Sequence, residues 1–146
     1  MLRLALLALS LLPLLAAPAI AEDAEDYPPL NGVAFSQAPE AGTGICFEAD
    51  AVTAMDCAQE ACMAESGLGP DDCVVDAFCY PHRWVADIFM QSAEGPHWRS
   101  LVCGAADRTE LDALVAAKCD HDYLIECGVV RAWDWDGFLI EDIDAL

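Results

Sequence analysis

Ile88-Phe-Met-Gln-Ser-Ala-Glu-Gly-Pro96 is an apolar run followed by a turn, and it repeats an arrangement found earlier at Val33-Ala-Phe-Ser-Gln-Ala-Pro-Glu-Ala-Gly42. In both places a second apolar run, an Ala- or Leu-rich segment ending in Cys and a β-branched segment follow. The cysteines recur with them: Cys46 as Cys103 and Cys62 as Cys119, both 57 residues on, and Cys73 as Cys127, 54 residues on. This repetition predicts two halves with the same order of elements.

The expected order in each half is β-β-α-β, with halves at residues 31–82 and 83–137 of a single domain. Helices are expected at Asp50–Ala64 and Asp107–Lys118. In the second helix either Asp107 followed by Glu110 or Thr109 followed by Asp112 has the pattern of a capped helix start, with an acid three residues after the cap. The expected fold class is α+β, with an antiparallel or mixed sheet, two helices and disulfide staples.

Residues 1–21 have the pattern of a secretory signal peptide: one Arg, a continuous apolar run and the small-residue triplet Ala19-Ile-Ala21. Cleavage is expected before Glu22. An acidic N-terminal arm at 22–30 and an acidic C-terminal tail at 138–146 flank the domain. The expected location is periplasmic or secreted, with no membrane insertion after cleavage.

The charge is strongly one-sided, since 26 acidic residues stand against 6 basic ones and give a formal net charge of −20. Such a chain repels nucleic acid, whose affinity for proteins comes largely from Lys and Arg on phosphates. A basic protein is the partner class that this charge favours.

Eight cysteines in an exported chain predict four disulfides. The sequence lacks the Cys-x-x-Cys spacing of thioredoxin-like and zinc-knuckle sites. Each helix end is expected to be bridged to the next strand, by Cys62–Cys73 and by Cys119–Cys127. The connectivity of the other four stays open, with Cys46–Cys79 and Cys57–Cys103 as the preferred pairs.

An Ala-rich helix ending in Cys62, then Cys73-Val-Val and Phe78-Cys79, resembles a family of small secreted bacterial domains of unknown function. The resemblance spans roughly Gly32 to Trp133. The family's helix-end and strand-start cysteines match Cys62 and Cys73, and again Cys119 and Cys127. Because the family has no established catalytic residues, the resemblance implies no catalytic role for any residue.

Two features of the sequence come close to metal-binding patterns without completing one. Asp134-Trp-Asp-Gly137 resembles part of a calcium-binding EF-hand loop, but its two anchoring positions would be Ala132 and Ile143. A strand that ends at Gly137 is the expected structure instead. His82, His97 and His121 share no ligand spacing, so we expect neither metal nor cofactor.

The candidate binding surface is Trp133, Asp134, Trp135 and Asp136, because Trp is enriched at binding hot spots and the carboxylates suit a basic partner. Trp84 and Trp98 are the other two tryptophans. The expected function is a non-catalytic interaction or envelope domain. One alternative is an acidic inhibitor of a cationic secreted enzyme, such as a lysozyme or protease; another is a small hydrolase that uses acidic residues.

Overall fold

The computed structural model describes residues 31–140, so the expected signal peptide, the N-terminal arm and most of the C-terminal tail lie outside the described range. The elements, in chain order, are β1 (Gly32–Ala38), β2 (Gly42–Glu48), α1 (Ala51–Ser66), β3 (Val74–Cys79), β4 (Trp84–Ser92), β5 (His97–Ala105), α2 (Arg108–Cys119) and β6 (Leu124–Trp133). The expected α+β class and the two β-β-α-β halves are confirmed.

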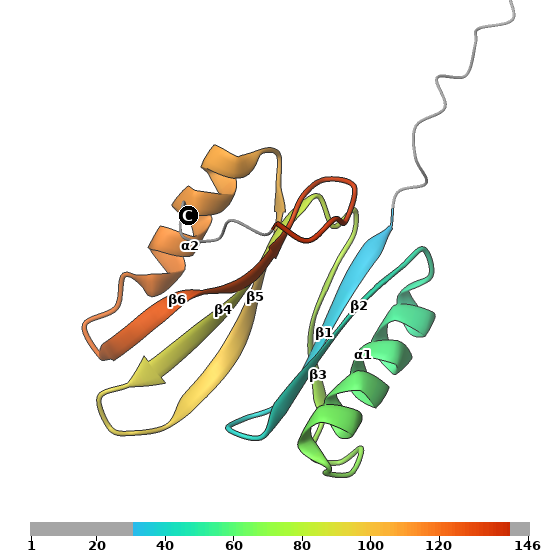
Figure 1. The fold of residues 1–146 in the computed structure, drawn as a ribbon, viewed down its shortest axis with the longest axis horizontal. Helices are drawn as coiled ribbons and strands as arrows, with labels where there is room; N and C mark the ends of the chain where they lie inside the picture. Colours follow the sequence, from blue (N-terminus) through green and yellow to red (C-terminus); the bar gives the residue numbers. More distant parts are fainter. Residues whose placement is uncertain (1–30, 141–146) are drawn as a thin grey trace, which may run out of the picture.

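The strands form two three-stranded antiparallel sheets rather than the single sheet that the sequence suggested. The order is β2-β1-β3 in the N-terminal sheet and β5-β4-β6 in the C-terminal sheet, so the first strand of each half lies in the middle. The sheets pack face to face, with α1 and α2 on the outside, in four layers (Figure 1). The two halves share one topology, while a sequence duplication behind it stays a prediction.

Both helices begin at an Asp cap: Asp107 is one of the two predicted candidates, and Asp50 stands at the start of the first expected helix range. The Asp50 carboxylate accepts hydrogen bonds from the backbone N–H of Thr53 at 2.9 Å and from its hydroxyl at 3.0 Å. Asp107 accepts from the N–H of Glu110 at 2.9 Å, and Glu110 in turn accepts from the N–H of Ala106 at 2.6 Å. These bonds satisfy donors that a helix start otherwise leaves unpaired.

Helix α1 packs against the N-terminal sheet through small residues. Its buried Ala54 and Ala58 contact Ala34 of β1. Gly44 of β2 lies so close to the helix backbone that a Cβ at this position would come within 1.8 Å of the Ala58 carbonyl oxygen. The helix and the strand can approach this closely only because residue 44 has no side chain.

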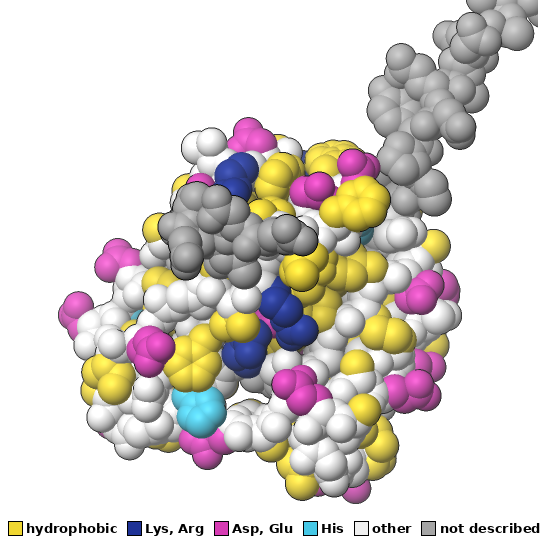
Figure 2. Space-filling model, in the orientation of Figure 1, with side chains coloured by type: hydrophobic (Ala, Val, Ile, Leu, Met, Phe, Trp, Pro, Cys, Tyr) yellow, Lys and Arg dark blue, Asp and Glu magenta, His cyan; other side chains and the backbone are white. Residues whose placement is uncertain are grey.

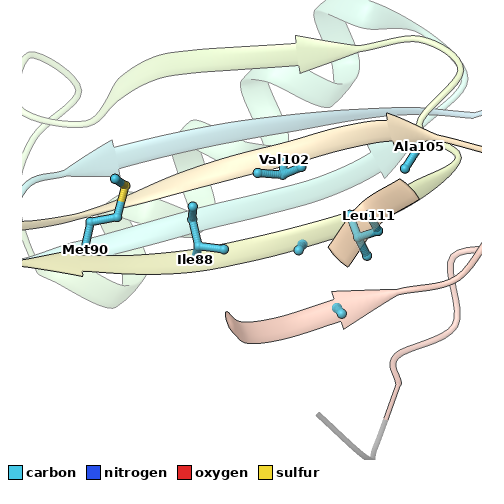
Figure 3. Close-up of a cluster of buried hydrophobic side chains, with 7 residues drawn as sticks. Ile88, Met90, Val102, Ala105 and Leu111 are labelled. Atoms are coloured by element: carbon cyan, nitrogen blue, oxygen red, sulfur yellow. The ribbon is translucent and has the colours of Figure 1, made fainter. Parts of the chain in front are cut away.

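Helix α2 packs against the C-terminal sheet through larger apolar side chains. Leu111 of the helix belongs to one buried cluster with Ile88 and Met90 of β4 and Val102 and Ala105 of β5. In Figure 3 Leu111 lies toward the Ala105 end of this cluster, and Met90 lies at the opposite end. The half-buried Trp84 and Trp98 also pack against this cluster. The C-terminal half therefore holds the main apolar core of the described domain.

The inner faces of the two sheets meet along alternate strand positions. Val33 and Phe35 of β1 and Val85 and Asp87 of β4 are fully buried, while their strand neighbours Ala34 and Ala86 contact the outer helices. Two strand-edge contacts close the interface at one side: Phe47 of β2 packs on Trp133 of β6 at 5.5 Å between ring centroids, and Thr43 faces Arg131.

All eight cysteines are bridged, by Cys46–Cys57, Cys62–Cys73, Cys79–Cys103 and Cys119–Cys127. The two bridges expected at the helix ends are present. The preferred pairs Cys46–Cys79 and Cys57–Cys103 are wrong, because the two cysteines of each pair lie on opposite sides of the N-terminal sheet. Four disulfides indicate an oxidising, extracytoplasmic compartment.

The corrected pairing follows the two faces of the N-terminal sheet. Cys46 lies opposite Ala34, on the face covered by α1, and so it meets Cys57 of that helix. Cys79 lies opposite Val33, on the inner face, and meets Cys103 of β5. Cys79–Cys103 is thus the bridge that joins the two sheets.

Candidate functional site between the sheets

Asp87 is the centre of a charged cluster between the sheets. It lies in the middle strand of the C-terminal sheet with 0% of its surface exposed. Strand pairing places Arg131 of β6 directly opposite, and Arg99 of β5 two residues along from its partner position. A carboxylate buried this deeply is stable only with charge partners and hydrogen bonds, and the two arginines supply both.

Each arginine donates two hydrogen bonds to the Asp87 carboxylate, one from Nε and one from Nη2. Arg99 donates from Nε to Oδ1 at 2.9 Å and from Nη2 to Oδ2. Arg131 donates to Oδ2 from Nε at 3.1 Å and from Nη2 at 2.9 Å, and its Nη2 also lies 3.5 Å from the hydroxyl of Thr43. With two guanidinium groups on one carboxylate, the cluster carries a formal charge of +1.

The cluster reaches the surface through the arginine side chains, which are 20% exposed for Arg99 and 40% exposed for Arg131. Figure 2 shows basic side chains gathered in the middle of one face, in the seam between the two sheets, with carboxylates spread over the surrounding surface. In so acidic a chain this is a local reversal of charge.

A pocket of about 160 Å³ adjoins Arg99. One wall is the β1–β2 turn, residues 37–43; the other consists of Phe89 and residues 97–99. Two hydrogen bonds tie the walls together: the N–H of Arg99 donates to Gln37 Oε1 at 3.2 Å, and the N–H of His97 donates to Glu40 Oε1 at 3.3 Å. The pocket is therefore built jointly by the two halves.

The predicted surface at Trp133–Asp136 is a turn and not the end of a strand. β6 ends at Trp133, and the Asp134 carboxylate accepts from the N–H groups of Asp136 at 3.0 Å and Phe138 at 2.9 Å. Ile140 then hydrogen-bonds back to the carbonyl of Ala132 at 2.8 Å. The expectation of a continuous strand to Gly137 is wrong, because Asp134 favours a side-chain-to-backbone turn.

This turn, hereafter the 134–139 turn, exposes a small aromatic and apolar group. Trp135 is 40% exposed and lies 5.4 Å below the guanidinium carbon of Arg83, while Phe138 is 70% exposed. Trp133 differs, because it is half-buried between Phe47 and Arg131. The four predicted site residues are thus adjacent, but only Trp135 and Asp136 are exposed.

The three histidines lie far apart in the fold and make different contacts. His82 is buried, packs edge-on against Phe47 at 5.0 Å and pairs through Nδ1 with the Arg83 carbonyl at 2.7 Å. His121 stacks on Tyr123 at the opposite end of β6. Within residues 31–140 no group of three or more His, Cys, Asp or Glu is placed to hold a metal ion.

The Asp87–Arg99–Arg131 cluster was missed from the sequence, although a signal was there. Asp87 interrupts the apolar run Val85-Ala86-Asp87-Ile88, where a strand covered on both faces is expected to be uniformly apolar. Arg99 and Arg131 also stand within strands, β5 and β6, in a chain with few bases. A charged side chain in a buried strand needs a partner of opposite charge, so an Asp in one buried strand and an Arg in a neighbouring strand predict an ion pair.

No protein-family model, curated protein or solved structure matches this chain. In the part of the chain that the structure describes, no helix is long and apolar enough to cross a membrane.

Proposed function

We propose that the protein is a non-catalytic interaction domain, periplasmic or secreted, that binds a basic protein through the 134–139 turn. The observation that carries the proposal is the placement of charge around an exposed aromatic group. Trp135 and Phe138 stand out from the surface beside the exposed carboxylate of Asp136, and the whole chain has a net charge of −20.

Three of the five basic residues in the described range face carboxylates, while Arg83 lies over the ring of Trp135 itself. Arg99 and Arg131 are turned to the buried Asp87, and Arg108 pairs with Asp112 at 3.3 Å. Among the described residues, only the carboxylates of Asp87 and Asp112 form ion pairs. The charges of the other carboxylates are not neutralised by a neighbouring base, so they add to the negative field around the protein. Such a field speeds the encounter with a cationic partner.

Rigidity also favours a binding role. The 134–139 turn is fixed by two hydrogen bonds from Asp134 and by the return of Ile140 to Ala132, and Ile140 packs on the main core. A preorganised aromatic anchor loses little conformational entropy on binding. Four disulfides hold the surrounding scaffold.

The test is surface plasmon resonance with a cationic lysozyme as the probe, at about 20 and 150 mM salt, where the screening length falls from roughly 20 to 8 Å. We expect association to slow at the higher salt. Trp135→Ala should raise the off-rate and leave the on-rate unchanged, whereas Asp136→Asn should lower the on-rate. Asp134 is left intact because it holds the turn.

Tyr123→Ala is the matched control, since Tyr123 is also an exposed aromatic residue but lies at the start of β6, away from the turn. This variant should bind like the wild type. Salt-independent binding, no binding by the wild type or an equal loss in Tyr123→Ala would contradict the proposal. Measuring lysozyme activity in the same mixtures tests the inhibitor alternative, for which activity must fall as the complex forms.

A further inference from the structure

We propose that a lysine side chain of the basic partner enters a groove at Phe89, between the β1–β2 turn and β6. This inference rests on the proposed function, because it assigns a second contact to the same partner. The groove, hereafter the Phe89 groove, joins the pocket beside Arg99 to a second hollow along residues 126–130 of β6, and Phe89 lines both. In Figure 2 the surface is hollowed between the two halves, below the basic side chains.

The charge balance of the groove favours a cation. Glu40 lines the pocket, Glu126 lines the second hollow, and Glu65 accepts two hydrogen bonds from Thr43, which also lines the pocket. Against these three carboxylates, the cluster of Asp87 with its two arginines supplies a formal charge of +1, which leaves a net formal charge of −2. Both guanidinium groups are already held by the Asp87 carboxylate.

Two carboxylates of the groove have free acceptor oxygens. Glu40 accepts from the N–H of His97 through Oε1 at 3.3 Å, and among the described residues no donor reaches its Oε2. Within residues 31–140 the side chain of Glu126 forms no ion pair. Both glutamates are exposed, and they come from different walls of the groove. A lysine ammonium has three donors that point in different directions and so suits carboxylates on two walls, whereas the planar guanidinium of an arginine suits a single carboxylate.

A partly exposed aromatic ring lies between these carboxylates. Phe89 is only half-buried, whereas Val85 and Asp87, on the same face of β4, are fully buried. Its partner on β6 is Gly128, and a Cβ at that position would meet no atom within 4 Å. The four-carbon stem of a lysine can therefore lie on Phe89 while its ammonium stays beside the carboxylates. Attraction between the ammonium and the aromatic face adds to this contact.

The size and position of the groove suit one side chain of a larger partner. The pocket has a volume of about 160 Å³, the space of roughly five water molecules, which is too small for a folded segment. Gly128 and Trp133 are both on β6, at a separation of about 17 Å along a strand. One protein surface can span this distance and contact both the groove and the 134–139 turn.

The first experiment is an NMR titration of the disulfide-bonded protein with Nα-acetyl-lysine amide. This probe should shift the backbone amides of Phe89, His97 and Gly128 in a saturable way. Nα-acetyl-norleucine amide, which has the same four-carbon stem without the ammonium, should bind about 10-fold more weakly. Equal binding of the two probes, or tighter binding of Nα-acetyl-arginine amide at the same signals, would overturn the proposal.

Gly128→Val closes the groove without changing its charge. Gly128 has no positive φ and its Cβ position is open, so a valine fits the strand there and covers Phe89. This variant should stay folded and bind the lysine probe about 10-fold more weakly. Gly69→Val is the matched control, because Gly69 is also open but lies in the loop before β3. Unchanged binding of the lysine probe by Gly128→Val would contradict the assignment.

Glu126→Gln removes the charge of one wall and keeps the size of the side chain. It should weaken binding of the lysine probe by about 5-fold. Glu60→Gln removes the same charge from an exposed position of α1, on the outside of the molecule, and should bind like the wild type. If both variants weaken binding equally, the effect is one of overall charge and the groove is not the site.

Surface plasmon resonance with the cationic lysozyme separates this inference from the proposed function. Gly128→Val and Trp135→Ala should each raise the off-rate. A faster off-rate in Trp135→Ala with no change in Gly128→Val would overturn the groove contact and leave the 134–139 turn as the partner site. Saturable binding of the lysine probe at the groove, without any lysozyme binding by the wild type, would overturn the proposed function and support the lysine site.

Discussion

The two halves of the molecule share one topology but hold their helices by different means. In the N-terminal half, α1 lies on alanines and a glycine, and two disulfides, Cys46–Cys57 and Cys62–Cys73, tie it to β2 and to the start of β3. In the C-terminal half, α2 lies on large apolar side chains, and the bridge Cys119–Cys127 ties its end to β6.

The difference shows that covalent links and apolar burial are exchangeable within one arrangement of strands and helix. Close packing of small residues removes little apolar surface from water per residue, and stabilisation follows the apolar area buried. Disulfides restore stability there by restricting the unfolded chain. The C-terminal half buries more apolar volume and also accommodates the charged cluster of Asp87.

The largest effect is expected from Asp87→Asn, which leaves Arg99 and Arg131 without their carboxylate at the junction of the halves. Breaking a buried ion pair by removing one partner costs about 3–5 kcal/mol, so the free energy of unfolding should fall by that amount. Urea unfolding followed by tryptophan fluorescence measures it. Asp112→Asn is the control, because its exposed pair with Arg108 should contribute under about 1 kcal/mol. If the two variants lost the same free energy of unfolding, the Asp87 cluster would not be the contact that stabilises the junction of the two halves.

Leu111→Ala should cost about 3 kcal/mol, because it opens a cavity between α2 and the C-terminal sheet. Helix α1 offers no such deletion, since its buried residues are Ala54, Ala58 and the disulfide-bonded Cys62. Ala58→Gly is its counterpart in α1 and should cost about 1 kcal/mol, from helix propensity. The same unfolding assay compares them, and an Ala58→Gly loss as large as that of Leu111→Ala would contradict the proposed difference between the halves.

The pair Cys46→Ser and Cys57→Ser should cost about 2–3 kcal/mol, from a bridge that spans 11 residues. Cys119→Ser with Cys127→Ser should cost about the same in total, because that bridge spans 8 residues. Hydrogen exchange sharpens the comparison. The amides of α1 should lose protection when Cys46–Cys57 is removed, whereas those of α2 should keep theirs without Cys119–Cys127, because Leu111 still anchors the helix.

The smallest effect is the acid response of the α1 cap. The Thr53 backbone N–H, followed by its hydroxyl, stabilises the Asp50 carboxylate and lowers its pKa below the ordinary value of 3.8. The cap therefore adds stability above that value, and this contribution is lost as the pH falls through the folded-state pKa. The stability difference between wild type and Asp50→Asn should be present at pH 6 and shrink in acid. A difference that stayed constant between pH 6 and strongly acid pH would contradict this role of Asp50.

Local features of the fold were predictable from the sequence. Asp107 marked the start of the second helix because an Asp cap is a local signal, and Cys62–Cys73 and Cys119–Cys127 followed from short loops between a helix end and the next strand. Each of these depends on residues within about a dozen positions of one another. The sequence carries such information directly.

The contacts between the halves were not predictable in the same way. The division of the six strands into two sheets depends on which strand edges pair, and these pairings join residues far apart in the sequence. The bridge Cys79–Cys103 and the ion pair of Asp87 with Arg131 both follow from that division. The predicted surface at Trp135 was in the right place but had the wrong backbone, because the turn relies on the side chain of Asp134. The pocket needs both halves, so no local pattern could reveal it.

The placement of the bridges sets an order for oxidative folding. Cys46–Cys57, Cys62–Cys73 and Cys119–Cys127 close loops of 11, 11 and 8 residues, each inside one half, so each half can be oxidised by itself. Cys79–Cys103 needs both sheets in contact. During synthesis the N-terminal half is complete before Cys103 of β5 has been made, so Cys79 has no partner at that stage. Its free thiol is then the group on which a disulfide isomerase would act. Formation of this last bridge would therefore report that the two halves have docked.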